Sequence, residues 1–292
     1  MNRRDLLKTF PALAAAAPSQ FAAAAGAKGR LRSAICAYTF RDALKANTMT
    51  YDDLVKLCVD YDLDGIDMTV YWFPDTSDAF LLPLKRLAYR NAVEIYSIAV
   101  RTEMTQPTPE LQQKELAELK KWVDVAEKLG AGHIRVFGGK VPKGATEDQA
   151  AGWVAEVLKR GAEYAGTKGI ILGLENHGGI TEKADTIVGI VKKVDSPWVG
   201  VNVDTGNFNR YAYDQLATIM PYAVNVQVKK EIKPDASGQP QPSDWDRIAG
   251  MLISQGYRGY LSLEYEGDDA TAKAPPLLRK LREVVHRHSV GA

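Results

Sequence analysis

The chain has little net charge and few cysteines, and both shortages exclude classes of protein. Among 292 residues, 37 lysines and arginines balance 36 aspartates and glutamates. A nucleic-acid binder normally presents a basic face to the phosphates, so this balance argues against a nucleic-acid partner. Cys36 and Cys58 are too few for a disulfide scaffold or a four-cysteine zinc site. We expect both to be small core side chains, and a disulfide between them stays open if the protein is exported.

Long apolar runs are also missing after the first 27 residues. At the start, Arg3 and Arg4 precede an alanine-rich apolar stretch, residues 9–25. A basic head, a short apolar middle and small residues are typical of an export signal, and the paired arginines resemble a twin-arginine signal. We therefore expect residues 1–27 to be removed on export to the periplasm. Residues 28–292 would be the mature domain, without stable membrane association.

From residue 33 onward, short β-branched or apolar runs alternate with stretches of helical periodicity. The expected strands are 33–41, 65–72, 93–101, 133–139, 170–177, 199–207, 223–230 and 259–266. The expected helices are 50–61, 77–91, 108–129, 146–168, 181–195, 212–220, 243–254 and 271–288. Eight such units in about 260 residues predict an α/β fold, a (β/α)8 TIM barrel. A doubly wound sheet is the competitor, but it usually has a glycine-rich turn after its first strand, and this chain has none there.

Polar residues alternate with aliphatic residues on the last four expected strands. In the sixth strand, Val201 and Val203 have one parity, whereas Asn202 and Asp204 have the other. Side chains alternate between the faces of a strand, and the outer face of a barrel strand meets helices. The polar parity therefore points into the barrel. Four consecutive strands each contribute one such residue near the carboxyl end: Glu175, Asp204, Gln227 and Glu264.

This inward-pointing set indicates a divalent metal. Carboxylates buried together without a partner are costly, and a cation removes that cost. Three carboxylates and one amide oxygen are hard ligands, which suit such an ion. Glu266 is the alternative to Glu264 as a ligand, because the sequence does not determine how deep in the barrel each residue of the last strand lies. The alternative is that Lys229 and Arg135 neutralise the carboxylates.

The motifs on these strands resemble the sugar phosphate isomerase/epimerase family, whose members are xylose isomerase-like TIM barrels. The resemblance lies in GLENHGG (173–179), GVNVDTGN (200–207), VNVQVKK (224–230) and LSLEYEG (261–267). It implies metal ligands at Glu175, Asp204, Gln227 and Glu264, with glutamine in place of the usual histidine. It also implies that Glu175 and Glu264 are catalytic and exchange the proton next to a substrate carbonyl. An all-oxygen site favours Mn²⁺, with Mg²⁺ or Co²⁺ as alternatives.

The residues expected to bind substrate have weaker support. They are His177, Lys229, Asn207, Arg135 and Glu103. His177 and Lys229 share the inward parity of the predicted ligands that precede them by two residues. Asn207 stands where the epimerases generally carry a substrate-binding histidine. Arg135 lies on the inward parity of its strand, and Glu103 follows the third strand.

The function expected from these features is a metal-dependent isomerase or epimerase. The substrate would be a small sugar, keto-sugar or glycoside, free rather than phosphorylated because the protein is expected to be exported. A lyase or hydratase on the same scaffold is the first alternative, and a periplasmic carbohydrate-binding protein is the second. An endonuclease-like activity would need several histidine ligands, and the chain has four histidines, two of them at its C-terminus. A homo-oligomer is compatible with the sequence.

Overall fold

The computed structural model describes residues 29–290, and eight parallel strands in this range close into a barrel. The strands are β1 (Leu31–Cys36), β2 (Gly65–Thr69), β3 (Glu94–Ala99), β4 (His133–Val136), β5 (Ile171–Glu175), β6 (Val199–Asp204), β7 (Ala223–Val228) and β10 (Gly259–Leu263). Each pairs with its neighbours in chain order, and β10 closes the barrel against β1. The predicted (β/α)8 barrel is therefore confirmed. The expected export signal, residues 1–27, lies outside the described residues.

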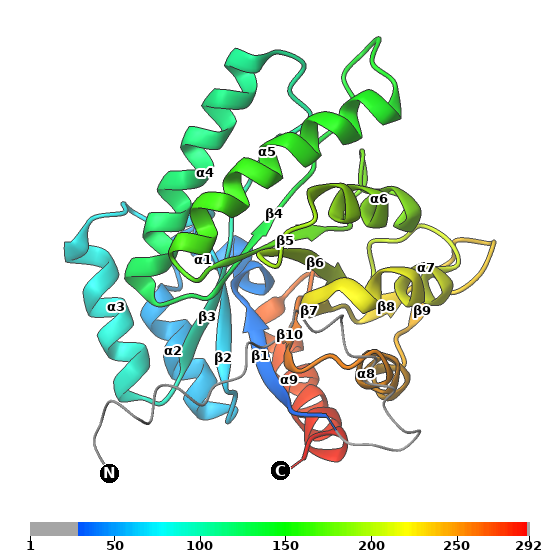
Figure 1. The fold of residues 1–292 in the computed structure, drawn as a ribbon. Helices are drawn as coiled ribbons and strands as arrows, with labels where there is room; N and C mark the ends of the chain where they lie inside the picture. The colour runs from blue at the N-terminus through cyan, green and yellow to red at the C-terminus, as the bar shows by residue number, and fades with distance from the viewer. Residues whose placement is uncertain (1–28, 291–292) are drawn as a thin grey trace, which may run out of the picture.

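Helices surround the strands (Figure 1). They are α1 (Arg41–Lys45), α2 (Tyr51–Asp60), α3 (Asp78–Arg90), α4 (Pro109–Leu129), α5 (Glu147–Thr167), α6 (Ala184–Val194), α7 (Ala212–Ile219), α8 (Trp245–Ser254) and α9 (Ala270–His288). Local sequence explains where they begin and end. The hydroxyl of Thr108 accepts a hydrogen bond from the backbone N–H of Leu111 at the start of α4. Gly130, in the left-handed region at φ 85°, ends the same helix.

The core lies between the outer face of the barrel and the helices. Val201 and Val203 of β6 are fully buried, as are Leu119 and Val123 of α4. Each fully buried aliphatic side chain of this size stabilises the fold by about 1.5–3 kcal/mol. Because the aliphatic side chains of the strands pack against the helices, the polar side chains of the opposite parity fill the barrel interior.

Three segments differ from the expected elements. The first expected strand, 33–41, ends at Cys36, and residues Ala37–Phe40 form a 3-10 helix that leads into α1. The second expected strand, 65–72, ends at Thr69, and residues Val70–Trp72 form a 3-10 helix. The segment after β7 contains a small hairpin, β8 (Glu231–Ile232) paired with β9 (Gln241–Pro242). All three differences lie at the carboxyl ends of strands, where the chain bends to form the barrel mouth. Within residues 29–290, every helix is too short or too polar to span a bilayer.

Candidate active site

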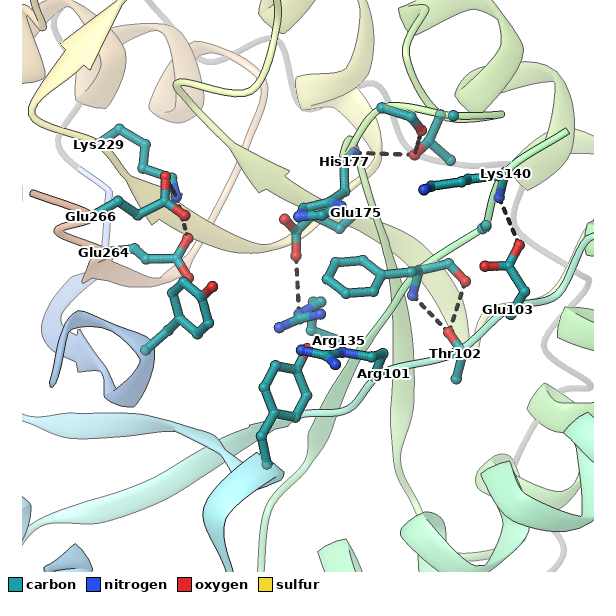
Figure 2. Close-up of a pocket in the computed structure, with 18 residues that line it drawn as sticks. Arg101, Thr102, Glu103, Arg135, Lys140, Glu175, His177, Lys229, Glu264 and Glu266 are labelled. Carbon is teal, nitrogen blue, oxygen red and sulfur yellow. Dashed lines mark hydrogen bonds and ion pairs between the residues drawn. The ribbon is translucent and has the colours of Figure 1, made fainter. Parts of the chain in front are cut away.

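A cavity of about 380 Å³ opens at the carboxyl ends of the barrel strands. This is the end at which TIM-barrel enzymes bind their substrates. Its charged lining residues are Arg101, Glu103, Arg135, Lys140, Glu175, Lys229, Glu264 and Glu266. Figure 2 shows Lys229, Glu264 and Glu266 on one side, Glu175 with Arg135 in the middle, and Glu103 with Lys140 on the other side.

Glu175 is the last residue of β5, and its carboxylate is buried beside a cation. The Nε atom of Arg135, from β4, lies 3.0 Å from Glu175 Oε2. The Nδ2 atom of Asn207 donates a hydrogen bond to Glu175 Oε1 over 3.1 Å. Asn207, predicted to bind substrate, therefore holds Glu175, and it does not line this cavity. Arg135 does line it, and its guanidinium also stacks 4.0 Å above the ring of Phe137.

Lys229 follows β7 and places its ammonium group among three carboxylates. The Nζ atom lies 2.6 Å from Glu264 Oε2, 3.0 Å from Glu266 Oε2 and 3.2 Å from Asp204 Oδ2. We call these four residues the lysine cluster. The lysine and two of the carboxylates are buried, whereas Glu266 is half-exposed. A cation of the chain itself thus offsets part of the negative charge of the three carboxylates.

Glu175, in the middle of the cavity, and Glu264, on one side of it, differ in proton affinity (Figure 2). Burial raises the pKa of Glu175 well above its ordinary value, although Arg135 acts against this rise. Burial would also raise the pKa of Glu264, but the charge and hydrogen bond of Lys229 outweigh it and lower that pKa to about 2. Pairs of titratable groups whose environments push their pKa values apart are typical of acid–base sites.

Gln227 was predicted as a metal ligand, and the structure places it elsewhere. Strand pairing sets Gln227 of β7 level with Ser262 of β10, so Glu264 lies one pleat closer to the mouth. The Oε1 atom of Gln227 accepts a hydrogen bond from Asn202 Nδ2 over 2.9 Å, and its Nε2 atom donates to Asp67 Oδ2 over 3.0 Å. Gln227 is therefore a member of a polar network below the cavity, with its carbonyl oxygen bound to Asn202 and its amide nitrogen to Asp67.

The residues of the predicted metal site do not fit a divalent cation in this arrangement. Lys229 occupies the point on which the carboxylates of Asp204 and Glu264 converge, and Arg135 holds the carboxylate of Glu175. Among residues 29–290, no group of three or more His, Cys, Asp or Glu side chains is arranged to hold a metal ion. The alternative left open by the sequence, pairing of the carboxylates with Lys229 and Arg135, is the arrangement observed.

His177 lies at the rim of the cavity. Its ring stacks on Phe137 with the centroids 4.1 Å apart, and its backbone N–H donates to Thr181 Oγ1 over 3.1 Å. Packing that shields the ring from water, together with the positive charge of Arg135, lowers the pKa of His177. The imidazole is therefore neutral at pH 7, and it can offer a hydrogen bond to a ligand without adding charge.

Glu103 lines the far side of the cavity, but its carboxylate ties two loops together. Its Oε1 atom accepts hydrogen bonds from Thr105 Oγ1 over 2.7 Å and from the backbone N–H of Lys140 over 2.6 Å. Gly139 allows this contact, because a Cβ atom there would lie 2.1 Å from Glu103 Oε1. The predicted substrate-binding residue thus shapes the cavity wall.

Several residues of the site were missed by sequence reasoning. Arg101 lines the cavity and stacks 4.4 Å above the ring of Tyr71. Asp67 is fully buried below the cavity, and burial raises the pKa of its carboxyl group. Both have a signal in the sequence, since Arg101 shares the parity of the inward-facing Ser97, and Asp67 alternates with two apolar neighbours on β2.

Cys36 and Cys58 are both free and buried. The Sγ atom of Cys36 lies 3.5 Å from Glu264 Oε1, whereas that of Cys58 lies 3.7 Å from the carbonyl oxygen of Gly65. We predict that a thiol reagent such as Ellman's reagent labels no cysteine in the folded protein and two after denaturation without reductant. If no cysteine is labelled after denaturation, Cys36 and Cys58 are joined by a disulfide.

One family model matches most of the chain. It is described as the xylose isomerase-like TIM barrel, and it matches residues 55–285. No curated protein sequence matches this chain.

Similar solved structures show the same fold at low sequence identity. The D-psicose 3-epimerase with D-tagatose from Clostridium cellulolyticum H10 has a TM-score of 0.69 and 15% identity, over 88% of this chain and 98% of the other. The probable 3-DHS dehydratase from Bacillus anthracis has a TM-score of 0.64 and 17% identity, over 87% and 98%. A xylose isomerase-like TIM barrel protein from Mycobacterium smegmatis in complex with magnesium has a TM-score of 0.68 and 20% identity, over 88% and 97%. Divalent metal binding, epimerases and a dehydratase therefore all occur on this fold.

Proposed function

The chain belongs to the xylose isomerase-like TIM barrel family, and we propose that it is an isomerase or epimerase of a sugar or related polyol that carries a carbonyl group. The reaction would proceed by proton transfer at the carbon next to the carbonyl. One observation carries this proposal: two buried carboxylates, Glu175 and Glu264, line the same cavity, and each contacts a buried cation, Arg135 or Lys229. A site that only binds sugar does not need such a pair.

Glu175 would remove the proton from the substrate carbon. Its raised pKa makes it the stronger base of the two glutamates, and Asn207 and Arg135 fix the direction of its carboxylate. The electrons of the broken C–H bond then form a carbon–carbon double bond, and negative charge develops on the former carbonyl oxygen. Arg135 and Lys229 are the cations that face the cavity near Glu175 and Glu264, and they would stabilise this oxygen.

Glu264 is ionised, because Lys229 lowers its pKa to about 2. In the second half of the reaction, Glu264 would therefore hold the ammonium group of Lys229, which supplies the proton, and exchange with water then restores both Lys229 and Glu175. In an epimerisation, one group takes a proton from one face of the carbon and a second group supplies a proton to the opposite face. Placement of Glu175 and Lys229 at separate positions around one cavity supports this division of roles (Figure 2). Positioning contributes much of the rate in such a scheme, because carboxylates are modest bases.

A lyase is the second candidate, and the ammonium group of Lys229 favours it. The same proton abstraction can expel an oxygen substituent from the next carbon, and the departing oxygen then needs a proton. Lys229 is a donor that lines the cavity, and a dehydratase occurs among the similar structures. The two candidates share Glu175 as the base and differ in whether a group leaves.

The test is hydrogen exchange in deuterated water. The protein is incubated with a panel of keto-sugars and 3-keto-glycosides, and the products are followed by NMR and mass spectrometry. Deuterium at the carbon next to the carbonyl, without loss of a group, supports the isomerase or epimerase. Loss of a substituent from the substrate would instead identify the protein as a lyase. An absence of both exchange and elimination across the panel would contradict the proposal.

We also propose that the protein acts after export by the twin-arginine pathway, on the basis of residues 1–27. Replacement of both arginines of the pair, Arg3→Lys and Arg4→Lys, is expected to leave the precursor unprocessed in the cytoplasm. Fractionation of cells followed by intact-mass measurement checks this. A variant that still reaches the periplasm at its processed mass would contradict the twin-arginine assignment.

A further inference from the structure

A second cavity, of about 440 Å³, adjoins the first at the barrel mouth. The two share three lining residues: Lys229, Glu264 and Glu266. The second cavity extends from there over the loop after β6 and the β8–β9 hairpin. Both volumes lie within the range of about 300–1,000 Å³ that is typical of ligand pockets. The mouth therefore offers two adjoining compartments, with part of the lysine cluster as the wall between them.

The wall between the compartments is held from several directions. The backbone N–H of Lys229 donates to Thr205 Oγ1 over 2.9 Å, and its carbonyl oxygen accepts from Trp245 Nε1 over 2.9 Å. Gly206 lets the lysine stem pass, because a Cβ atom there would lie 2.6 Å from Lys229 Cγ. Because carboxylates also fix the ammonium group of Lys229, this wall has its shape before a ligand binds. A ligand that occupies both compartments would not need to rearrange Lys229.

The chemistry of the second cavity suits a neutral, hydroxyl-rich ligand. Its charged lining residues are Lys229, Lys230, Lys233, Glu231, Glu264 and Glu266, so three lysines face three glutamates. A phosphate group would need an excess of cationic donors, which this balance does not provide. The side-chain amides of Asn207 and Asn209 also line the cavity, and amides both donate to and accept from hydroxyl groups.

We propose that the substrate is a two-ring glycoside that occupies both cavities. The ring that bears the carbonyl lies in the first cavity against Glu175, the second ring lies in the second cavity near Asn209, and the bond between them crosses Lys229. This assignment rests on the proposed function, because that function places the carbonyl in the first cavity. It narrows the substrate class from any small sugar to unphosphorylated glycosides of two rings.

The test compares binding of disaccharides with binding of their component monosaccharides. Isothermal titration calorimetry is carried out with the 3-keto derivatives of cellobiose, maltose and trehalose, and with their components 3-ketoglucose and glucose. We expect at least one disaccharide to bind tenfold or more tightly than either of its components. In an Asn209→Trp variant, the indole fills the second cavity, and this advantage is expected to disappear while monosaccharide binding stays unchanged. Asn209 is exposed, so the variant is expected to fold, which its thermal unfolding checks.

Equal affinity for one ring and two rings would overturn the inference, as would an advantage that survives Asn209→Trp. The exchange experiment in deuterated water separates this failure from a failure of the proposed function. Exchange without a preference for two rings contradicts only the second-ring site. A two-ring preference that Asn209→Trp removes, in a protein that catalyses neither exchange nor elimination, contradicts only the proposed reaction. An absence of any sugar binding contradicts both.

Discussion

Lys229→Met is expected to lower the free energy of unfolding by about 3–5 kcal/mol at pH 8, because it leaves buried carboxylates without their cation. Lys229 lies within 3.2 Å of oxygens of Asp204, Glu264 and Glu266. Methionine has a similar length and no charge, so packing changes little. The loss is expected to be smaller at pH 5, because burial raises the pKa of Asp204 to about 7 and this carboxyl is neutral there. Urea unfolding at the two pH values measures both effects.

The matched control is Lys230→Met, in the next residue. Lys230 is half-exposed and pairs with Glu231 over 3.1 Å. Exposed ion pairs contribute about 0.2–1 kcal/mol, so this substitution is expected to change the stability by less than 1 kcal/mol. Equal effects of the two substitutions would contradict a special role for Lys229 as the cation of the site.

Glu175→Gln is expected to reduce deuterium incorporation by about 10²–10⁴-fold, the usual contribution of a general base. Glutamine keeps the shape of the side chain, but it cannot accept the substrate proton, and its single oxygen can accept from only one of the donors Asn207 and Arg135. The rate of exchange at the carbon next to the carbonyl is followed by NMR with the substrate identified from the panel. Circular dichroism checks that the variant is folded, since Arg135 loses its partner charge.

Glu266→Gln is the control for this substitution. Glu266 also lines the cavity and contacts Lys229 over 3.0 Å, but it is half-exposed and far less constrained than Glu175. Its loss is expected to slow exchange by less than tenfold. A variant at Glu266 that is as inactive as Glu175→Gln would contradict the assignment of Glu175 as the base.

The fold could be predicted from the sequence because two periodicities separate cleanly. Leu116, Leu119 and Val123 recur at the helical spacing in α4, and Val201 and Val203 recur at the strand spacing in β6. Both sets are buried in the structure. The order of the eight units then follows from chain order, since each parallel strand returns through its own helix. Strand ends were less accurate, as at Cys36, because the residues after it continue the apolar run while the chain already turns.

The site could be predicted only in part. The parity of a residue on a strand predicts which face its side chain points to, but not how deep in the barrel the side chain lies. Glu175 and Glu264 do line the cavity, whereas Gln227, on the same inward parity, lies below it. The difference comes from the stagger of neighbouring strands, which sets Gln227 level with Ser262. No feature of a single strand encodes that stagger. Nor could the sequence place the flexible stem of Lys229, whose ammonium group decides the electrostatics of the mouth.

We propose that the chain's own cations, Lys229 and Arg135, supply the positive charge of this site. The most direct measurement is the metal content of the protein, by inductively coupled plasma mass spectrometry after expression with manganese, together with the exchange rate before and after treatment with EDTA. We predict less than about 0.1 metal ion per chain and an unchanged exchange rate. One bound manganese, magnesium or cobalt ion per chain, with exchange that EDTA abolishes and the metal restores, would contradict the account.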